Sequence, residues 1–165
     1  MGSGKSSIGK KLSKMMKFDF LDTDNLIEEN TGVDIPTIFE HEGESGFRER
    51  EKNILREISN CQRTVIGTGG GIIISEKNRE IIKEMGFVVY LTASIKELFY
   101  RTEHDKNRPL INSNDAENKI RDIINDRKAY YESSSDMKIN TDNYDTVKIS
   151  KIIINNYEKY KKNNS

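Results

Sequence analysis

The stretch that decides the fold is MGSGKSS, residues 1–7, followed by IGKKLSKMM, residues 8–16. A complete phosphate-binding loop reads glycine, four residues, then Gly-Lys-Ser/Thr, and Gly4-Lys5-Ser6 matches its end. Glycine is needed in such a loop because backbone N–H groups can curve around a phosphate only where no Cβ is in the way. The first glycine of the motif would precede Met1, so the sequence contains only the second half of the loop.

A helix is predicted directly after this loop, because the apolar residues 8, 12, 15 and 16 recur at helical spacing. Its N-terminus would face the anion, with Lys5 reaching the β- and γ-phosphates and the Ser6 hydroxyl binding Mg²⁺. The alternative is a flexible Gly/Ser tail, which would not require an amphipathic helix behind it. The loop residues expected to bind ATP are Gly2, Ser3, Gly4, Lys5, Ser6 and Ser7.

Length and composition favour one cytoplasmic domain. A chain of 165 residues can bury about 70% of its unfolded surface without disulfides, and the single cysteine, Cys61, cannot form an internal bridge. Lys plus Arg and Asp plus Glu number 27 each, so no net field attracts nucleic acid or a membrane. No apolar run is long enough to span a bilayer or form a signal peptide. We expect a single domain over residues 1–159 and a frayed tail at 160–165.

Short apolar runs alternate with longer amphipathic ones, which is the pattern of an α/β fold with a parallel sheet between helical layers. The predicted strands are residues 18–21, 63–66, 87–91 and 137–140, and 87–91 is the clearest buried strand. The predicted helices are residues 24–30, 35–42, 44–59, 75–85, 94–101, 115–132 and 146–159. Gly32 is expected to stop the first of them, and Ser75 to cap the helix 75–85. Ser94 and Glu97 form a predicted capping box, and the polar segment 103–113 is expected to be a mobile loop.

Candidate site residues fall where the predicted strands end, and ligands of parallel sheets gather beyond the carboxyl ends of the strands. Asp22 and Asp24 project to the same side, which suits one carboxylate for a hydrated metal and the other for a substrate hydroxyl. That Asp22 or Asp24 only caps the next helix is an equally open interpretation. The glycines at 69–71 exceed what an ordinary turn needs, which indicates a ligand pressed against bare backbone.

Two arginines are placed unusually for solvated charges. Arg127 falls on the apolar stripe of the predicted helix 115–132, seven residues after Ile120, so its guanidinium must pair with an anion or reach out to solvent. Structural and ligand-binding roles are equally open for it. Arg48 lies at the margin of a stripe within reach of Glu44 and Glu51, and this spacing alone favours an ion pair on the helix surface.

Together these segments resemble the shikimate kinase family over nearly the whole chain. The resemblance rests on pieces in the family's order and at about its spacing, namely GSGKSSIGKKL, LDTDNLIE, TGVDIPTIFEHEGESGFRERE, GTGGG, NRPL and DRKAYY. It implies a P-loop kinase fold with a parallel sheet, a helical substrate-binding region and a lid. It also implies transfer of the γ-phosphoryl group of ATP to the 3-hydroxyl of shikimate with the aid of Mg²⁺, on the route to chorismate and the aromatic amino acids. We expect the protein to be a monomer.

The resemblance implies roles at the nucleotide end of the site. Lys5 and Ser6 would hold the phosphates and Mg²⁺, and Asp22 would reach the metal through water. Arg108, in the lid, would swing over the transferring phosphate, which makes it catalytic together with Lys5. Arg101 would lie against adenine, so both arginines belong to the predicted nucleotide-binding residues.

At the substrate end, the resemblance implies that Asp24 accepts a hydrogen bond from the reacting hydroxyl and acts as the base. Arg48 and Arg127 would clamp the shikimate carboxylate, with Glu51 holding Arg48 in place. The implied substrate-binding residues are Asp24, Arg48, Gly69, Gly70, Gly71 and Arg127, with Phe39 and Phe47 as apolar walls.

The sequence departs from the family pattern in two places. The strand before the phosphate loop is absent, and because that strand is central in the family, its neighbours would lose hydrogen-bond ladders on both sides. We hypothesise that the true start lies upstream of Met1, and we expect a chain that starts there to be unstable or inactive. Segment 141–145 offers Asp142, Asn143 and Tyr144 where the family tends to place a basic residue near adenine, so nucleotide preference stays open.

Two other functions are compatible with part of these residues. Another P-loop small-molecule kinase, such as one acting on gluconate, could use the arginine pair, although the GFRERE and GTGGG context argues against it. A nucleotide-binding remnant without activity would follow from the missing strand. Binding of ATP without shikimate-dependent release of ADP would identify the remnant.

Overall fold

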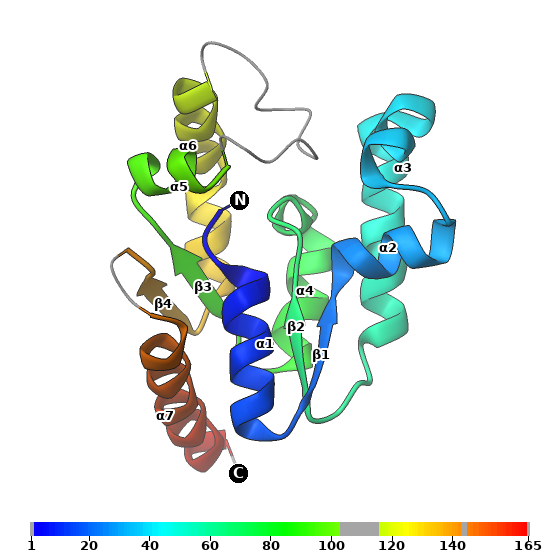
Figure 1. Ribbon diagram of the computed structural model, residues 1–165. Helices are drawn as coiled ribbons and strands as arrows, with labels where there is room; N and C mark the ends of the chain where they lie inside the picture. The colour runs from blue at the N-terminus through cyan, green and yellow to red at the C-terminus, as the bar shows by residue number, and fades with distance from the viewer. Residues whose placement is uncertain (1, 103–115, 143–144, 165) are drawn as a thin grey trace.

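The computed structural model describes residues 2–102, 116–142 and 145–164 (Figure 1). Its elements in chain order are α1 (Lys5–Met16), β1 (Asp19–Asp22), α2 (Thr23–Thr31), α3 (Ile35–Ile58), β2 (Thr64–Gly67), the 3₁₀ helix η1 (Ile72–Ile74), α4 (Glu76–Met85), β3 (Val89–Thr92), α5 (Ile95–Thr102), α6 (Ala116–Ser134), β4 (Met137–Asn140) and α7 (Thr146–Asn164). The predicted alternation of strands and helices is confirmed, and η1 was not predicted.

The strands form two parallel pairs. Strand β1 pairs with β2, with Phe20 opposite Val65, and β3 pairs with β4, with Leu91 opposite Ile139. The α/β class with parallel strands is confirmed, and among the described residues β2 and β3 are not hydrogen-bonded to each other.

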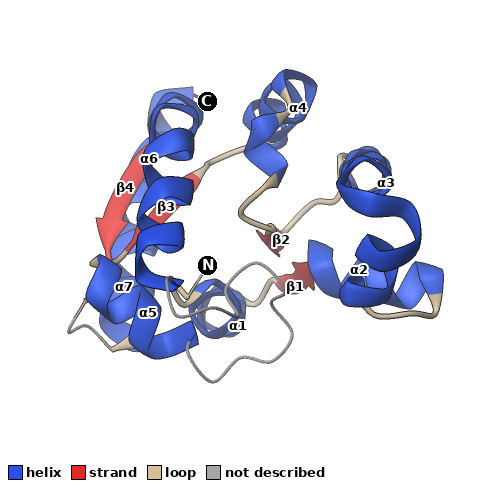
Figure 2. Ribbon diagram, turned by 90° about the horizontal axis from the view of Figure 1, so that it is seen from above, coloured by secondary structure: helices blue, strands red, loops and turns tan. Residues whose placement is uncertain are grey.

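Helices cover both faces of the strands. Residues of α1 and α7 form one apolar cluster with side chains of β3 and β4, while α2 and α3 form another with β1 and β2. Seen from above, the two strand pairs lie apart, with α1 on one side of the strands and α4 on the other (Figure 2). None of the helices in the described ranges is both long and apolar enough to cross a membrane.

Local signals in the sequence account for most helix ends. Helix α2 stops at Gly32, which has a left-handed φ of 70° that glycine adopts without strain. Helix α3 is interrupted at Gly43, where φ is 68° and ψ is −172°, so the two predicted helices 35–42 and 44–59 are confirmed as segments on either side of a kink. The hydroxyl of Ser75 accepts a hydrogen bond from the Asn78 N–H at 3.4 Å and caps α4 as predicted.

Three sequence predictions about these elements are wrong. The tail is helical through Tyr160 to Asn164, because the Tyr160 ring packs against Phe87 at a centroid distance of 5.1 Å. Strand β3 is only half-buried, because its side toward β2 has no strand neighbour among the described residues. The capping box of α5 is half formed: the Glu97 N–H donates to the Ser94 hydroxyl at 3.3 Å, but the Glu97 carboxylate pairs with Arg101 instead.

Candidate active site

The phosphate loop is held by glycines in left-handed conformations at the start of α1. Gly2 has a φ of 63° and Gly4 a φ of 85°, and the Ile8 N–H donates to the Gly4 carbonyl at 2.9 Å. Gly4 is the N-cap residue and has no side chain to compete for the N–H groups of the first turn. A phosphate oxygen can take that place, at the positive end of the helix dipole. The flexible-tail alternative is wrong, since residues 5–16 are helical.

Arg101 connects this loop to the neighbouring elements. Its guanidinium donates to the Gly2 carbonyl at 3.2 Å and to the Thr141 carbonyl at 3.0 Å. A Cβ on Gly2 would lie 2.9 Å from the Thr102 side chain, so only glycine lets the loop approach α5 this closely. The predicted contact of Arg101 with adenine stays a prediction, and the structure places Arg101 at the loop that would carry the phosphates.

Ser6 and Asp22 come together from different elements. The Ser6 hydroxyl donates to Asp22 Oδ2 at 2.8 Å, while the Asp24 N–H donates to Asp22 Oδ1 at 3.2 Å. Asp22 therefore caps α2 with one carboxylate oxygen and faces the phosphate loop with the other. The capping interpretation is confirmed, and the metal-site interpretation stays a prediction.

The oxygens of Ser6 and Asp22 fit a Mg²⁺ ion. Magnesium takes oxygen ligands, keeps several waters and usually binds only one or two protein groups together with substrate phosphates. The described ranges contain no group of three or more His, Cys, Asp or Glu side chains that could hold a metal by themselves. A magnesium ion at Ser6 and Asp22 would therefore depend on the nucleotide phosphates and water for its remaining ligands.

The glycine loop at 69–71 is the meeting point of the predicted substrate-binding residues. A Cβ on Gly69 would lie 2.6 Å from Asp24 Oδ1, and one on Gly71 would overlap the guanidinium of Arg48. The Gly70 carbonyl lies 3.5 Å from Arg127 Nη1. Three residues that are far apart in the sequence thus converge on one short loop, and the absence of side chains on that loop is what allows it.

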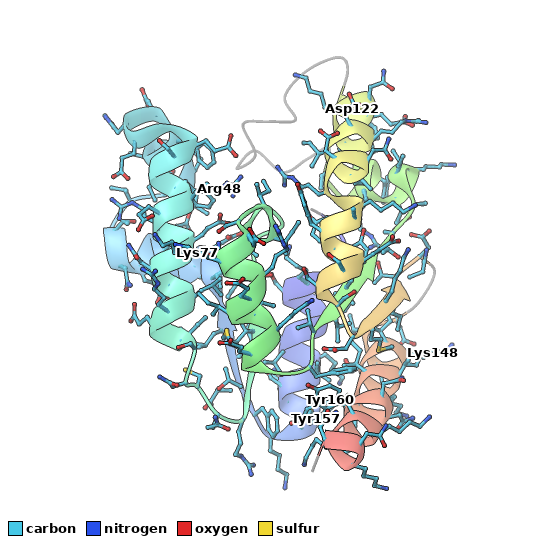
Figure 3. The ribbon with its side chains drawn as sticks, turned by 180° about the vertical axis from the view of Figure 1, so that it is seen from behind. Arg48, Lys77, Asp122, Lys148, Tyr157 and Tyr160 are labelled. Atoms are coloured by element: carbon cyan, nitrogen blue, oxygen red, sulfur yellow. The ribbon has the colours of Figure 1, made fainter. Side chains whose placement is uncertain are left out.

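Arg48 is held by two carboxylates of its own helix. Its Nη1 lies 2.6 Å from Glu51 Oε2 and its Nη2 lies 2.7 Å from Glu44 Oε1. The ion pair that the spacing favoured is formed, with an exposed Glu44, but the Glu51 side chain is 1% exposed, so the Glu51 half of the pair is buried and not on the helix surface. Arg48 points from α3 toward α4 and the loop before it (Figure 3).

Burial and charge act against each other in this group. Burial alone would lower the pKa of Arg48, but its hydrogen bonds to Glu51 and Glu44 and their charges outweigh burial and raise that pKa. Burial raises the pKa of Glu51, and the charge of the nearby Asp24 raises it further. Arg48 and Arg127 lower this pKa, but the net change is upward. Arg48 therefore stays protonated and positioned at the edge of the glycine loop, as a site for an anion requires.

The two predicted wall residues are in contact. The Phe39 and Phe47 rings lie 4.9 Å apart between centroids, and the Arg48 guanidinium carbon lies 5.5 Å from the Phe47 centroid. Both rings line a cavity of about 770 Å³ that the glycine loop and Asp24 also border. The site therefore offers an apolar wall beside its cationic and anionic groups.

Two residues of the site were not predicted. The Tyr131 hydroxyl donates to the Gly70 carbonyl at 2.5 Å, and the Thr23 hydroxyl accepts from the Gly69 N–H at 3.1 Å. Both contacts orient the glycine loop. Tyr131 follows Arg127 by one helical turn on the same stripe, so its polar tip was the available signal.

Part of the predicted site lies outside the described residues. This applies to Arg108, to the loop at 103–113 that contains it, and to Asn143 and Tyr144. Asp142 is described, and its carboxylate accepts the Ser94 N–H at 2.9 Å, which gives it a structural role at the start of α5.

A phosphate loop at the N-terminus of a helix, within parallel strands covered by helices, defines a P-loop protein of the kinase type. The comparisons with known proteins narrow this class. The family profile described as Shikimate kinase matches residues 1–158. The shikimate kinase of Haemophilus influenzae (strain PittEE) is 42% identical over 158 residues, covering 94% of this chain and 84% of that protein.

Solved structures agree with this result. The structure described as shikimate kinase from Acinetobacter baumannii in complex with shikimate has a TM-score of 0.90 at 40% identity, covering 93% of this chain and 86% of the other. Shikimate kinase from Bacteroides thetaiotaomicron has a TM-score of 0.86 at 30% identity, covering 96% and 94%. The chain belongs to the shikimate kinase family.

Proposed function

We propose that this protein transfers the γ-phosphoryl group of ATP to the 3-hydroxyl of shikimate, giving shikimate 3-phosphate and ADP. The observation that carries the proposal is the convergence of Arg48, Arg127 and Asp24 on the glycines at 69–71. This arrangement offers cations for a carboxylate and a base for a hydroxyl in one place. Shikimate carries both groups, and the similar structure from Acinetobacter baumannii holds that molecule.

Arg48 and Arg127 bind the substrate carboxylate in this proposal. A guanidinium matches a carboxylate with parallel hydrogen bonds, and both arginines border bare backbone, so the substrate ring can lie against the glycine loop. Glu51 keeps Arg48 aimed at the loop through its 2.6 Å contact. Tyr131 fixes the Gly70 carbonyl and with it the surface that the ring contacts.

Asp24 is the proposed base. As the 3-hydroxyl oxygen forms a bond to the γ-phosphorus, the bond from that phosphorus to the bridging oxygen of ADP breaks, and Asp24 takes the hydroxyl proton. Ser6, and Asp22 through water, would hold Mg²⁺, which would supply positive charge next to the phosphates. The remaining requirements are positioning and the exclusion of water.

The proposed nucleotide site continues along the phosphate loop. Lys5 neutralises the β- and γ-phosphates, and the first-turn N–H groups of α1 surround them. Arg101 lies beside the adenine, and Arg108 reaches the transferring phosphate from the lid. We further propose that the protein acts in the cytoplasm as a monomer.

The test is release of ADP with and without shikimate, measured with gluconate as the competing acceptor. The proposal expects ADP release that depends on shikimate and on Mg²⁺. Arg127→Gln should raise the KM for shikimate at least about tenfold, because a charged hydrogen-bond pair is lost, while the KM for ATP changes little. Arg121→Gln is the matched control, since that arginine is half-exposed on the same helix and pairs with Glu117.

Three results would contradict the proposal. ADP release that is equal with gluconate would point to another small-molecule kinase. ATP binding without any shikimate-dependent release would identify a nucleotide-binding remnant. A KM for shikimate that is the same in Arg127→Gln and Arg121→Gln would remove Arg127 from the substrate site.

A further inference from the structure

Helix α3 consists of two segments that meet at Gly43 (Figure 1). At this residue φ is 68° and ψ is −172°, a backbone conformation that is almost confined to glycine. A Cβ at Gly43 would meet nothing within 4 Å, so the backbone angles and not the packing require glycine here. Because the regular helical backbone is interrupted, other contacts must fix the angle between residues 35–42 and residues 44–58.

The first segment, residues 35–42, forms part of the wall of the active site. Phe39 lines the cavity of about 770 Å³ that Asp24 also borders. The Phe39 ring lies 4.9 Å from the ring of Phe47, which belongs to the second segment. The angle at Gly43 therefore determines how far Phe39 reaches over the cavity.

An ion pair between Glu42 and Arg50 connects the two segments. Arg50 Nη2 lies 2.5 Å from Glu42 Oε1, and Arg50 Nε donates to Glu42 Oε2 at 2.9 Å, so the contact is bidentate. The two residues are eight positions apart, whereas neighbours on a straight helix are three or four positions apart. The pair therefore spans the kink. Its hydrogen bonds lower the pKa of Glu42 and raise the pKa of Arg50, so both side chains are charged at neutral pH.

Gly46 gives Glu42 the space for this contact. A Cβ on Gly46 would lie 2.5 Å from the Cβ of Glu42 and 2.8 Å from its Oε2. Glycine within a helix is less favourable than alanine, and the close approach of Glu42 explains its presence here. The Glu42 side chain thus lies against the bare backbone of the second segment.

The position of this ion pair distinguishes it from an ordinary surface contact. An exposed pair alone contributes little to stability, and the side chains of Glu42 and Arg50 are 38% and 37% exposed. The pair of Glu49 and Lys52 lies entirely within the second segment, so it cannot influence the angle at Gly43. The pair of Glu42 and Arg50 has one partner on each side of that residue.

We propose that Glu42 and Arg50 are positioning residues for the phosphoryl acceptor. Their ion pair sets the angle of α3 at Gly43 and so holds Phe39 against the apolar face of the substrate ring. This role rests on the proposed function, because shikimate is taken as the acceptor. It also gives the pair a part in specificity, since an open-chain acceptor such as gluconate has no ring face for Phe39 to cover.

The test compares Arg50→Gln with Glu49→Gln, the matched control on the same helix. Arg50→Gln should raise the KM for shikimate about three- to fivefold while the KM for ATP changes little, because only the wall beside the acceptor moves. Arg50→Lys keeps the charge but loses the bidentate geometry, so its KM for shikimate should lie between those of the parent protein and Arg50→Gln. Glu49→Gln should leave both KM values unchanged.

Gly46→Ala separates positioning from stability. Alanine favours the helix, but its Cβ would displace the Glu42 carboxylate from its place beside Arg50. We therefore expect the KM for shikimate to rise about three- to fivefold, as in Arg50→Gln, with an unchanged or higher urea midpoint.

Amide hydrogen exchange tests the position of the first segment without substrate. Arg50→Gln should speed exchange about threefold or more in residues 37–42 and leave residues 52–58 unchanged, and Glu49→Gln should change neither range. If the parent protein shows no release of ADP that depends on shikimate, the proposed function fails. Exchange in residues 37–42 still decides in that case whether the ion pair holds the segment.

The proposal is wrong if Arg50→Gln and Glu49→Gln have the same KM for shikimate, since the pair would then be an ordinary surface contact. It is also wrong if exchange in residues 37–42 is the same in Arg50→Gln and the parent protein. A rise in the KM for ATP as large as that for shikimate would contradict it as well, because the substitution would then disturb the whole site and not one wall.

Discussion

At the scale of single residues, the active site depends on glycines that keep Cβ atoms away from charged groups. Gly71→Ala would place a Cβ within the guanidinium of Arg48, so that side chain must move away from the substrate carboxylate. We expect a rise of about tenfold or more in the KM for shikimate, with a small change in the KM for ATP. Steady-state kinetics test this.

Gly67→Ala is the control, because its Cβ would make an ordinary contact at 3.4 Å with the Phe20 ring. Equal KM values for shikimate in Gly71→Ala and the parent protein would show that Arg48 does not bind the substrate where the structure holds it.

Glu51 gives a prediction about pH. Burial raises its pKa above the ordinary value of 4.5, so the unfolded chain loses this proton at a lower pH than the folded protein does. The contribution of Glu51 to stability is therefore fully present below about pH 4.5 and is lost as the pH rises through the raised pKa. We expect the parent protein to lose stability relative to Glu51→Gln as the pH rises.

Urea unfolding of both proteins between about pH 4 and pH 8 measures this difference. If the parent protein instead becomes more stable than Glu51→Gln as the pH rises, the ion pair with Arg48 outweighs burial in its effect on the pKa of Glu51.

The sequence identified the chemical groups of the site better than their surroundings. Asp24 and Arg127 were singled out as candidates at a strand end and on a helical stripe, while the substrate role of Arg48 came from the family resemblance, and the structure brings all three to the glycine loop. The burial of Glu51 was not predicted from spacing. Helical periodicity places a residue at the edge of an apolar stripe, but it does not show which neighbouring element covers that edge. Tyr131 was not predicted as a site residue, since an aromatic residue on an apolar stripe is most often a packing residue.

At the scale of elements, periodicity predicted which segments are helices and strands, and local caps predicted several of their ends. Gly32, Gly43 and Ser75 act as the sequence indicated, because their effects are local to the backbone. The predictions that failed depend on contacts distant in sequence. The Ser94 N–H donates to Asp142 rather than completing a local capping box, and no pattern within α5 contains that information.

The end of α7 illustrates the same point and can be tested. The Phe87 ring lies 5.1 Å from Tyr160 and 6.0 Å from Tyr157, and these contacts extend the helix past its predicted end. Tyr160→Ala should lower the free energy of unfolding by about 1 kcal/mol or somewhat more, from the aromatic contact and lost burial. Urea denaturation followed by circular dichroism measures it.

Tyr100→Ala is the matched control, because that ring is 70% exposed. If both substitutions have the same small effect, the last turns of α7 are not held by the aromatic contact.

At the scale of the whole molecule, two strand pairs that are not hydrogen-bonded to each other must be joined through helices. Helix α1 provides this connection: it packs against α7, β1 and β2, and Leu12 lies in a cluster that also contains Val65 of β2 and Val89 of β3. Leu12 is 8% exposed, so Leu12→Ala should cost about 2–4 kcal/mol. This loss of stability weakens the packing of α1, which connects the half with β1 and β2 to the half with β3 and β4.

We therefore expect Leu12→Ala to separate the unfolding of the two halves. In urea, far-UV circular dichroism and tyrosine fluorescence should give transitions that no longer coincide, and each should be shallower than in the parent protein. Leu55→Ala is the matched control, because Leu55 is fully buried in a cluster with Ile72 and Ile73 that contains no residue of α1. Leu55→Ala should lower the urea midpoint by a similar amount, while the transitions measured by circular dichroism and by fluorescence still coincide. Coincident transitions with an unchanged slope in Leu12→Ala would show that the halves are coupled by other contacts, because weakening α1 would then have lowered the stability of the whole molecule as one unit.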